Sequence, residues 1–511
     1  MKTQTPIWQG HLKNVFGLDI RALALVRIAL ALGISHDLWI RLSHLTEHYG
    51  NFGVFPKTVW ENEWKSNGYW SLHLLSGSPE WSFLLFILHA GFVFFLLIGF
   101  KTRIATIGVW LLLVSLHNAN PFINQGSDAI LRIFLLICIF LPLGKKYSID
   151  ALRNSSSPKE NAYQSPWTAV YIFQVALIYF TSGISKNGEL WQQGNAVYVA
   201  LSRDHFRTSF GSLIYMSREL MTSLTYVVHF VQYLAPYFLL SPYKTVYLRT
   251  TAVFTLMLMH IGLGLSVHLG PFTWVTVTIL AGLLPGSFFD FAELAFKKTR
   301  VYGRFHAFFS KYKRLPVQNA YESEPQLSRI RSGVYFLTGL LATLFISFSF
   351  LQDVSILIPE SMRPAVLDKV SKIAALSGTN HTWNFFAPEP TKIDGWIAVR
   401  GVFSDGSTSN LFPKPHTFSL EEPSDIARAS FIQDIRIQKY VTNLLFSPQV
   451  ASHASYYADY MCRHFWSGIG NDTSVTLERV DVIAVKKAIL ESGKGPATHE
   501  VLATSVCASL K

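Results

Sequence analysis

Three basic side chains stand in or beside apolar runs, where a charged group is costly. Lys186 follows a long apolar run in the segment YFTSGISKNGELW, and His260 and His268 lie in the later run MHIGLGLSVHLG. Ionisable groups at membrane depth are expensive and therefore mark candidate functional sites. A lysine amine in a low-dielectric pocket loses its proton more easily, which makes Lys186 a candidate base or nucleophile. The alternative is a lysine whose stem lies in the membrane and whose amine reaches water.

Other polar residues in the apolar runs suggest structural as well as chemical roles. The two histidines are eight residues apart, so they would share one helix face but lie about 12 Å apart along its axis. A metal site made of both is therefore not expected, and an interhelical hydrogen bond is the alternative for either ring. Asp128 and Arg132, in GSDAILR, are four residues apart and could form an ion pair. Arg27, in the first apolar run, is expected to face a polar core or a partner carboxylate.

The composition indicates that a lipid bilayer surrounds the elements that carry these residues. Half of the 511 residues are hydrophobic and 15% are charged, against about 25% in soluble domains. The net charge of +12 lies mainly between apolar runs, so membrane topology explains it better than nucleic acid, which is not an expected partner. We predict an all-α polytopic membrane domain over residues 1–352. About nine transmembrane helices are expected, near residues 20–40, 82–100, 104–119, 129–144, 167–185, 222–240, 248–268, 271–290 and 333–352.

The distribution of Lys and Arg predicts the orientation of these helices. Basic residues follow every second apolar run, as in GFKTR after the second run and in the link 297–314 after the eighth. The positive-inside rule then places the N-terminus in the cytoplasm and the C-terminus outside the cytoplasm. The first apolar run is long and has no small-residue cleavage site, so it is expected to remain as a helix. The long outer link 186–221 could lie in the interface, re-enter the membrane or roof a cavity.

Residues 353–511 have a different composition and predict a small α+β extramembrane domain. The pair Asp405-Gly406 between β-prone runs is a strong hairpin signal. Cys462 and Cys507 could form a disulfide in an oxidising compartment or remain as two thiols. The expected elements are strands at 396–403 and 408–412, a helical stretch near 424–465 and a strand near 474–486.

Several blocks, in this order, resemble the horizontally transferred transmembrane (HTTM) domain family, and its bacterial members in particular. The blocks are DIRALALVRIALALG, GFKTR, NPFINQGSDAILRIFLL, LPLGKKYSIDA, YFTSGISKNGELWQQGNAVYVAL, MHIGLGLSVHLGPFTWVTVTILAGLLP and the tail motif WNFFAPEPTKIDGWIAVRG. The known enzyme of this family is the vitamin K-dependent gamma-glutamyl carboxylase. In it, a lysine amine deprotonates vitamin K hydroquinone, oxygen adds, and the strong base that forms removes a glutamate γ-proton before CO2 is captured.

The resemblance implies roles for particular residues. Gly183-Ile184-Ser185-Lys186, followed by Trp191 and Gly194, matches the segment that holds the carboxylase lysine. A vitamin K-type hydroquinone, menaquinol in bacteria, would be the cofactor, and no metal is expected. We therefore predict Lys186 and His260 as catalytic residues, and Asp128, Arg132, Trp191 and His268 as cofactor contacts.

The sequence also departs from the carboxylase pattern in two places. The carboxylases have a catalytic histidine before the fourth helix, where this chain has Asp128, and His117 falls earlier. The large propeptide-docking domain is replaced by the tail. The favoured function is a quinol-dependent membrane enzyme that modifies a peptide or small substrate at the outer face. The alternative is a non-enzymatic membrane protein that assists maturation or export of a secreted peptide or protein. A transporter is less favoured, because no paired inverted repeats are evident.

Overall fold

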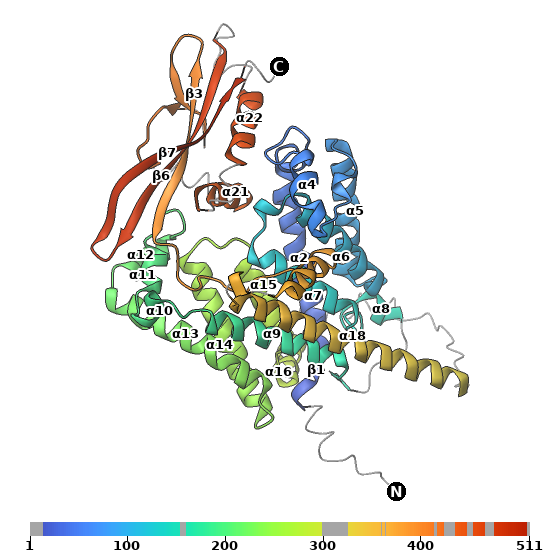
Figure 1. The fold of residues 1–511 in the computed structure, drawn as a ribbon. Coiled ribbons are helices and arrows are strands. Elements are labelled where there is room, and N and C mark those ends of the chain that lie inside the picture. Colours follow the sequence, from blue (N-terminus) through green and yellow to red (C-terminus); the bar gives the residue numbers. More distant parts are fainter. Residues whose placement is uncertain are drawn as a thin grey trace.

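A helical body carries a long antiparallel sheet at one end (Figure 1). The computed structural model describes residues 14–153, 160–298, 325–358, 360–362, 364–412, 416–423, 435–446, 453–465 and 475–507. Most of the basic link 297–314 and part of the expected helical stretch 424–465 lie outside these ranges. A short ladder of β1 (Leu18–Asp19) and β2 (Ala162–Tyr163) lies at the end of the body opposite the sheet.

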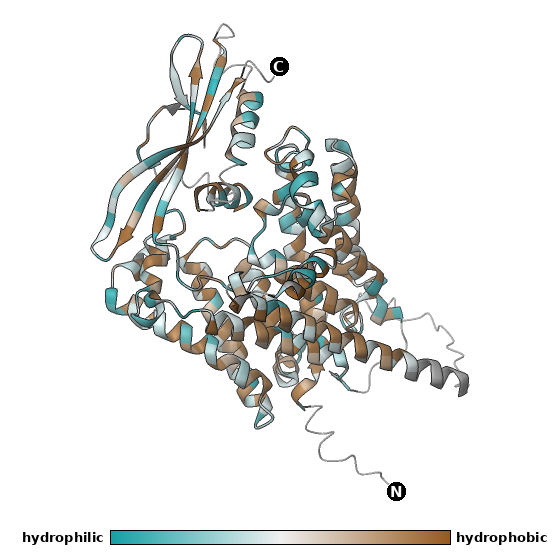
Figure 2. Ribbon diagram, viewed as in Figure 1, coloured by the Kyte–Doolittle hydropathy of each residue, from teal (hydrophilic) through white to brown (hydrophobic). Residues whose placement is uncertain are grey.

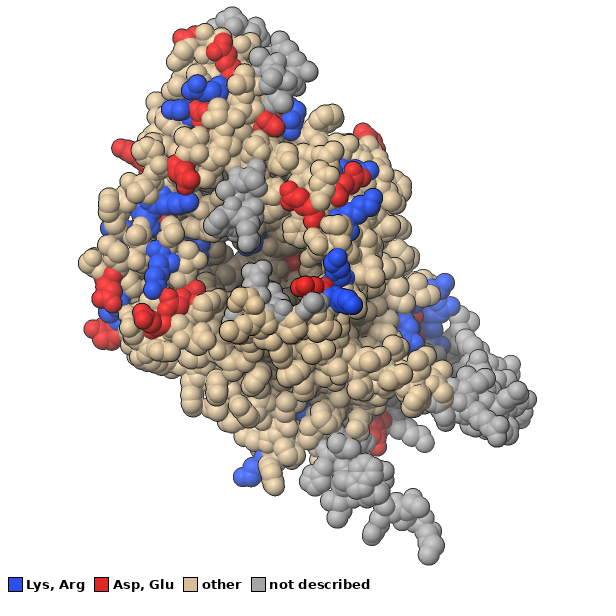
Figure 3. Space-filling model, viewed as in Figure 1, with Lys and Arg blue, Asp and Glu red and all other residues tan. Residues whose placement is uncertain are grey.

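Five described helices are long and apolar enough to cross a bilayer. They are α2 (Ile20–Ser43), α5 (Pro79–Ile98), α9 (Pro166–Ile184), α14 (Thr245–Ser266) and α18 (Pro325–Leu357). A sixth candidate is the broken pair α15 (Phe272–Ala281) and α16 (Gly286–Lys297), whose axes bend by 98°. Figure 2 shows that apolar residues dominate these helices, and Figure 3 shows few charged side chains over the helical body below the sheet. The chain is therefore a membrane protein.

Nine spans are not confirmed. A helix occupies each expected position, but α6 (Thr102–Ala119), α7 (Gly126–Ile139) and α13 (Arg218–Leu240) are not among the candidate spans. The 14 residues of α7 extend for only about 21 Å at 1.5 Å per residue, short of the ~30 Å hydrocarbon core. In α13, polar residues such as Gln232 lower the mean hydropathy.

Local sequence explains where the spanning helices begin and end. The side chains of Asp19, Ser78 and Ser165 accept hydrogen bonds from backbone N–H groups in the first turns of α2, α5 and α9, as N-caps do. Gly99 ends α5 at a φ of 69°, which a residue without Cβ adopts easily. Phe83, on α5, is about half exposed, as a lipid-facing residue should be.

Short helices fill the links on the sheet side of the body. The link after α2 forms α3 (Leu45–Tyr49) and α4 (Lys57–Glu63), and the link after α9 forms α10 (Glu189–Gln192), α11 (Ala196–Leu201) and α12 (Ser209–Tyr215). On the opposite side, α8 (Ile149–Arg153) follows α7.

The tail contains a five-stranded antiparallel sheet. Its order is β5 (His416–Thr417), β4 (Thr408–Asn410), β3 (Ile393–Phe403), β6 (Leu477–Leu490) and β7 (Gly493–Val506). The hairpin around Asp405-Gly406 is confirmed, with Val402 opposite Thr408. The edge strand β7 was not predicted, because GKGPATHEVLATSV has no clear alternation of apolar and polar residues.

Three helices connect the sheet to the body. The helix α19 (Ala365–Leu376) follows α18, while α21 (Ile435–Phe446) and α22 (Ala454–Phe465) lie between the sheet and the membrane helices (Figure 1). Cys462 of α22 and Cys507, directly after β7, form a disulfide. Of the two predicted states of this pair, the structure therefore contains the disulfide and not the two thiols.

Candidate functional site

A cavity of about 770 Å³ lies among α9–α15 and the tail helix α21. Its walls are mainly apolar, and it has the volume of a typical small-molecule site. Four of the six predicted site residues line it: Lys186, Trp191, His260 and His268. The link 186–221 supplies part of the wall. Of its three predicted placements, the one beside a cavity therefore agrees with the structure.

The amine of Lys186 is buried in the wall of this cavity. The residue is 2% exposed, so the alternative of an amine in open water is wrong. Its Nζ donates to the carbonyl oxygen of Ser182 at 2.9 Å and to the Ser182 Oγ at 2.7 Å. No described carboxylate lies within ion-pair distance of this amine. Lys186 lies two residues beyond the end of α9, and burial lowers its pKa to about 7.

The segment around Lys186 is held in place from both sides. Trp191 lies with its ring centroid 5.3 Å from the Lys186 Nζ and donates from its indole N–H to the Phe386 carbonyl oxygen at 2.9 Å. A Glu389 oxygen accepts from the Leu190 N–H at 2.9 Å. Phe386 and Glu389, in the tail segment FAPEP, thus fix the helix that presents Trp191 to the lysine.

His260 connects two spanning helices at the cavity wall. Its Nε2 lies 2.8 Å from the Tyr179 hydroxyl, so α14 and α9 share a hydrogen bond. The Nδ1 of His260 is buried and has no described partner. An interhelical hydrogen bond was the predicted structural alternative for His260, and the structure contains it. The Nδ1 without a described partner can still bind a ligand.

The position of His268 differs from the prediction. The expected helix 248–268 ends at Ser266, so His268 does not share a helix face with His260. Its backbone N–H donates to the Phe206 carbonyl oxygen at 2.7 Å. The chain that follows α14 therefore places His268 beside the link 186–221, next to Phe206.

Asp128 belongs to a buried ion-pair network instead of the cavity lining. Its oxygens accept from Arg436 at 2.6 and 2.9 Å and face Arg41 at 3.4 Å. Asp37 also pairs with Arg41, at 2.8 Å, and with Arg436. The charges of two carboxylates and two guanidinium groups thus cancel in the interior. This pairing offsets the cost of burying each charge.

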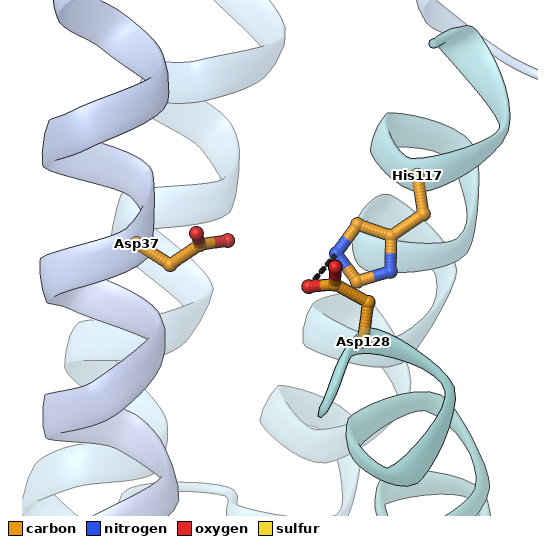
Figure 4. Close-up of side chains that lie close together, drawn as sticks. All are labelled: Asp37, His117 and Asp128. Atoms are coloured by element: carbon orange, nitrogen blue, oxygen red, sulfur yellow. Dashed lines mark ion pairs between the residues drawn. The ribbon is translucent and has the colours of Figure 1, made fainter. Parts of the chain in front are cut away.

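Asp37, His117 and Asp128 converge closely enough to resemble a metal site (Figure 4). The His117 Nε2 lies 3.4 Å from an Asp128 oxygen. However, both Arg41 and Arg436 already donate to these carboxylates. A cation would have to displace them, so the donor set fits an ion-pair network better than a metal ion.

The expected ion pair between Asp128 and Arg132 does not form. Arg132 donates to the Gly378 carbonyl oxygen at 3.0 Å and the Asn380 carbonyl oxygen at 3.1 Å, and contacts the His117 Nδ1 at 3.2 Å. Neither Asp128 nor Arg132 is among the described lining residues, although Gln125 and Gly126 at the start of α7 are. A cofactor contact through either residue stays a prediction.

Arg27 faces backbone carbonyl groups, so of its two predicted environments the structure contains the polar core and not the partner carboxylate. Its guanidinium donates to the carbonyl oxygens of Leu96 and Leu97 at 2.6 Å and of Tyr147 at 2.5 Å. The free carbonyls at the C-terminal end of α5 carry partial negative charge, which suits a buried cation. Arg27 is therefore structural.

Sequence reasoning missed several lining residues. Ser182 is four residues before Lys186 in one helical turn, so the i, i+4 spacing could have identified it. Arg203 and Lys439 also line the cavity, but they lie far apart in the chain. No local signal would have brought these two cations together.

Comparisons of the chain with protein-family models, curated proteins and solved structures find no match.

Proposed function

We propose that this protein is a membrane enzyme of the HTTM type in which Lys186 acts as a base on a lipid quinol. One observation carries this proposal. The Lys186 amine is buried in an apolar cavity, and among the described residues it is bonded only to Ser182, without a carboxylate that would keep it charged. Structural lysines at membrane depth pair with acids or reach water.

The cavity suits the chemical character of a quinol. A quinol needs apolar walls for its ring and prenyl chain, and polar groups for its two oxygens. Phe272 and Phe385 stack edge-to-face at 5.0 Å on the wall, and the unpartnered Nδ1 of His260 is a polar atom that still lacks a bond. Lys186 and His260 would therefore hold the two oxygens.

The residues around Lys186 can support proton transfer to its Nζ. When bound, a quinol supplies a weakly acidic hydroxyl whose proton the neutral amine can accept. The Ser182 carbonyl and hydroxyl oxygens would then accept bonds from the ammonium, and the Trp191 ring would stabilise its charge. The downstream substrate would be a peptide or small molecule at the outer face.

The test uses purified protein in nanodiscs with reduced menaquinone-4 as the probe. The substitution Lys186→Met should abolish deprotonation of the bound quinol, which is measured by the change in quinol absorbance. Quinol retention is measured separately. Lys65→Met, at an exposed lysine, is the matched control. Deprotonation at the wild-type level in Lys186→Met would exclude Lys186 as the base.

The same assay has an expected pH dependence. Only the neutral amine accepts a proton, and burial lowers the Lys186 pKa to about 7. The rate should therefore be small at pH 5.5, rise through about pH 7 and level off above it. A rate that rises only above pH 9 would contradict a buried neutral amine.

We also propose nine crossings, with the N-terminus in the cytoplasm and the tail outside it. The distribution of basic links supports this orientation, and two features support an odd number of crossings. The β1–β2 ladder and the long sheet lie at opposite ends of the body (Figure 1), as an odd number of crossings would place them. The described residues of α7 are mostly buried, so neighbouring helices shield this short segment from lipid.

A second candidate function rests on β7. This strand ends the described sheet and is largely exposed, and a free edge can add an extended peptide as a further strand. A non-enzymatic protein that holds a secreted peptide in this way would retain its function in Lys186→Met. The enzyme would not.

A further inference from the structure

A pair of cations at the tail side of the cavity has no ion pair with any described acidic residue. Arg203 follows α11 and is 7% exposed, and Lys439 lies on α21. Both side chains line the cavity. No Asp or Glu is among the described lining residues, so the cavity combines apolar walls with uncompensated positive charge.

Arg203 is only partly satisfied by the protein. Its Nε is buried without a described partner, and a terminal nitrogen meets the His205 ring at 3.4 Å. The guanidinium carbon lies 4.3 Å from the Phe206 centroid and 4.8 Å from the Phe446 centroid. Stacked rings orient a guanidinium and leave its edge for an anion.

The carboxylates that act on these cations are already occupied. Asp394 accepts from His205 at 3.0 Å and from Lys494 at 2.5 Å. Asp128 is held by Arg436 and Arg41, as described above. Burial and the charge of Arg203 lower the pKa of Lys439, so a bound anion would relieve the repulsion between two neighbouring cations.

The rim of the cavity on α12–α14 is apolar and exposed, as a lipid-facing surface would be. Phe210, Leu220, Val227 and Leu258, on α12–α14, line the cavity and are also more than a third exposed. A ligand with an acyl chain could enter from the bilayer across this rim without crossing water. A polar peptide would lose its hydration on the same route.

We propose that Arg203 and Lys439 bind the anionic head group of an amphiphile whose acyl chain occupies the apolar cavity. The head is a carboxylate or a phosphate, the two anions that a guanidinium edge binds in two-pronged fashion. The inference does not rest on the proposed function, because neither cation takes part in proton transfer to Lys186.

The test measures equilibrium binding of three radiolabelled probes to the purified full-length protein in a neutral maltoside detergent. The probes are oleate, 1-oleoyl-lysophosphatidate and oleyl alcohol. At least one anionic probe should bind roughly tenfold or more tightly than the alcohol, and the tighter of the two identifies the head. Equal binding of all three would show an apolar cavity only and would overturn the proposal.

Variants distinguish the loss of this site from misfolding. Arg203→Gln and Lys439→Gln should each weaken the anionic probe roughly tenfold or more, whereas Arg203→Lys and Lys439→Arg should retain most of the binding. The exposed control Lys65→Gln should bind the probe as the wild type does. Unchanged affinity in folded Arg203→Gln and Lys439→Gln would overturn the assignment. Displacement of the labelled probe by a glutamate-containing peptide, but not by unlabelled amphiphile, would also overturn it.

Discussion

Among the described residues of the tail, Arg436 forms ion pairs with two carboxylates of the helical body. It is fully buried and donates to both Asp37 and Asp128, which come from α2 and α7. It also donates to the Ile123 carbonyl oxygen at 3.0 Å. These carboxylates raise the pKa of Arg436 above its usual value despite its burial, so the guanidinium stays charged at every physiological pH.

Removal of Arg436 should therefore destabilise the protein strongly. In Arg436→Ala, Asp37 and Asp128 would share only Arg41, and breaking a buried pair in this way costs about 3–5 kcal/mol. Thermal unfolding in detergent should show a large fall in Tm. Arg436→Lys should recover part of the loss, because it restores the charge without the fork of donors.

The matched control is Arg479→Ala, at a side chain that is 46% exposed and faces Asp481 at 3.4 Å. Exposed ion pairs contribute about 0–1 kcal/mol. Similar unfolding temperatures for Arg436→Ala and Arg479→Ala would mean that the buried network adds no net stability.

At the level of elements, α21 and α22 have different packing partners: α21 contacts the helical body, and α22 contacts the sheet. The helix α21 contacts the body, through Arg436 and through the Tyr440 hydroxyl, which donates to the Val54 carbonyl oxygen at 3.1 Å. The helix α22 packs on β6 and β7 and is joined to the end of β7 by the disulfide. The disulfide should therefore stabilise the sheet region and leave the cavity unchanged.

A double substitution, Cys462→Ser with Cys507→Ser, tests this division. The closed loop spans 45 residues, for which loss of a disulfide costs about 2–5 kcal/mol. Limited proteolysis should cleave the tail faster, while quinol retention in the cavity stays at the wild-type level. Reductant should reproduce the effect in the wild type and add nothing in the variant, and equal protease resistance would contradict the prediction.

For the whole molecule, the testable property is the side of the membrane on which each end lies. Nine crossings place the link after α16 in the cytoplasm and the tail outside it, because basic links remain on the cytoplasmic side. Alkaline phosphatase fused at the C-terminus should be active, and green fluorescent protein fused after Lys298 should fluoresce. A fluorescent C-terminal fusion would indicate an even number of crossings and contradict the orientation.

Much of the fold was predictable because it depends on local patterns. Apolar runs located the spanning helices, and Asp405-Gly406 located the hairpin between β3 and β4. The number of spans was less predictable, because a buried helix such as α7 is as apolar as a lipid-facing one. Hydrophobicity records removal from water and does not distinguish protein from lipid on the other side.

The candidate site was predictable only in part, and for the same reason. The sequence alone determined that Lys186 follows an apolar helix and lies near Trp191, because that relation spans five residues. Tertiary structure alone decided that His260 meets Tyr179, that Arg203 and Lys439 share a cavity, and that Arg436 reaches Asp37 across 399 residues. Helical periodicity acts over a few residues, whereas these contacts depend on how whole helices pack, and no local pattern of residues encodes that packing.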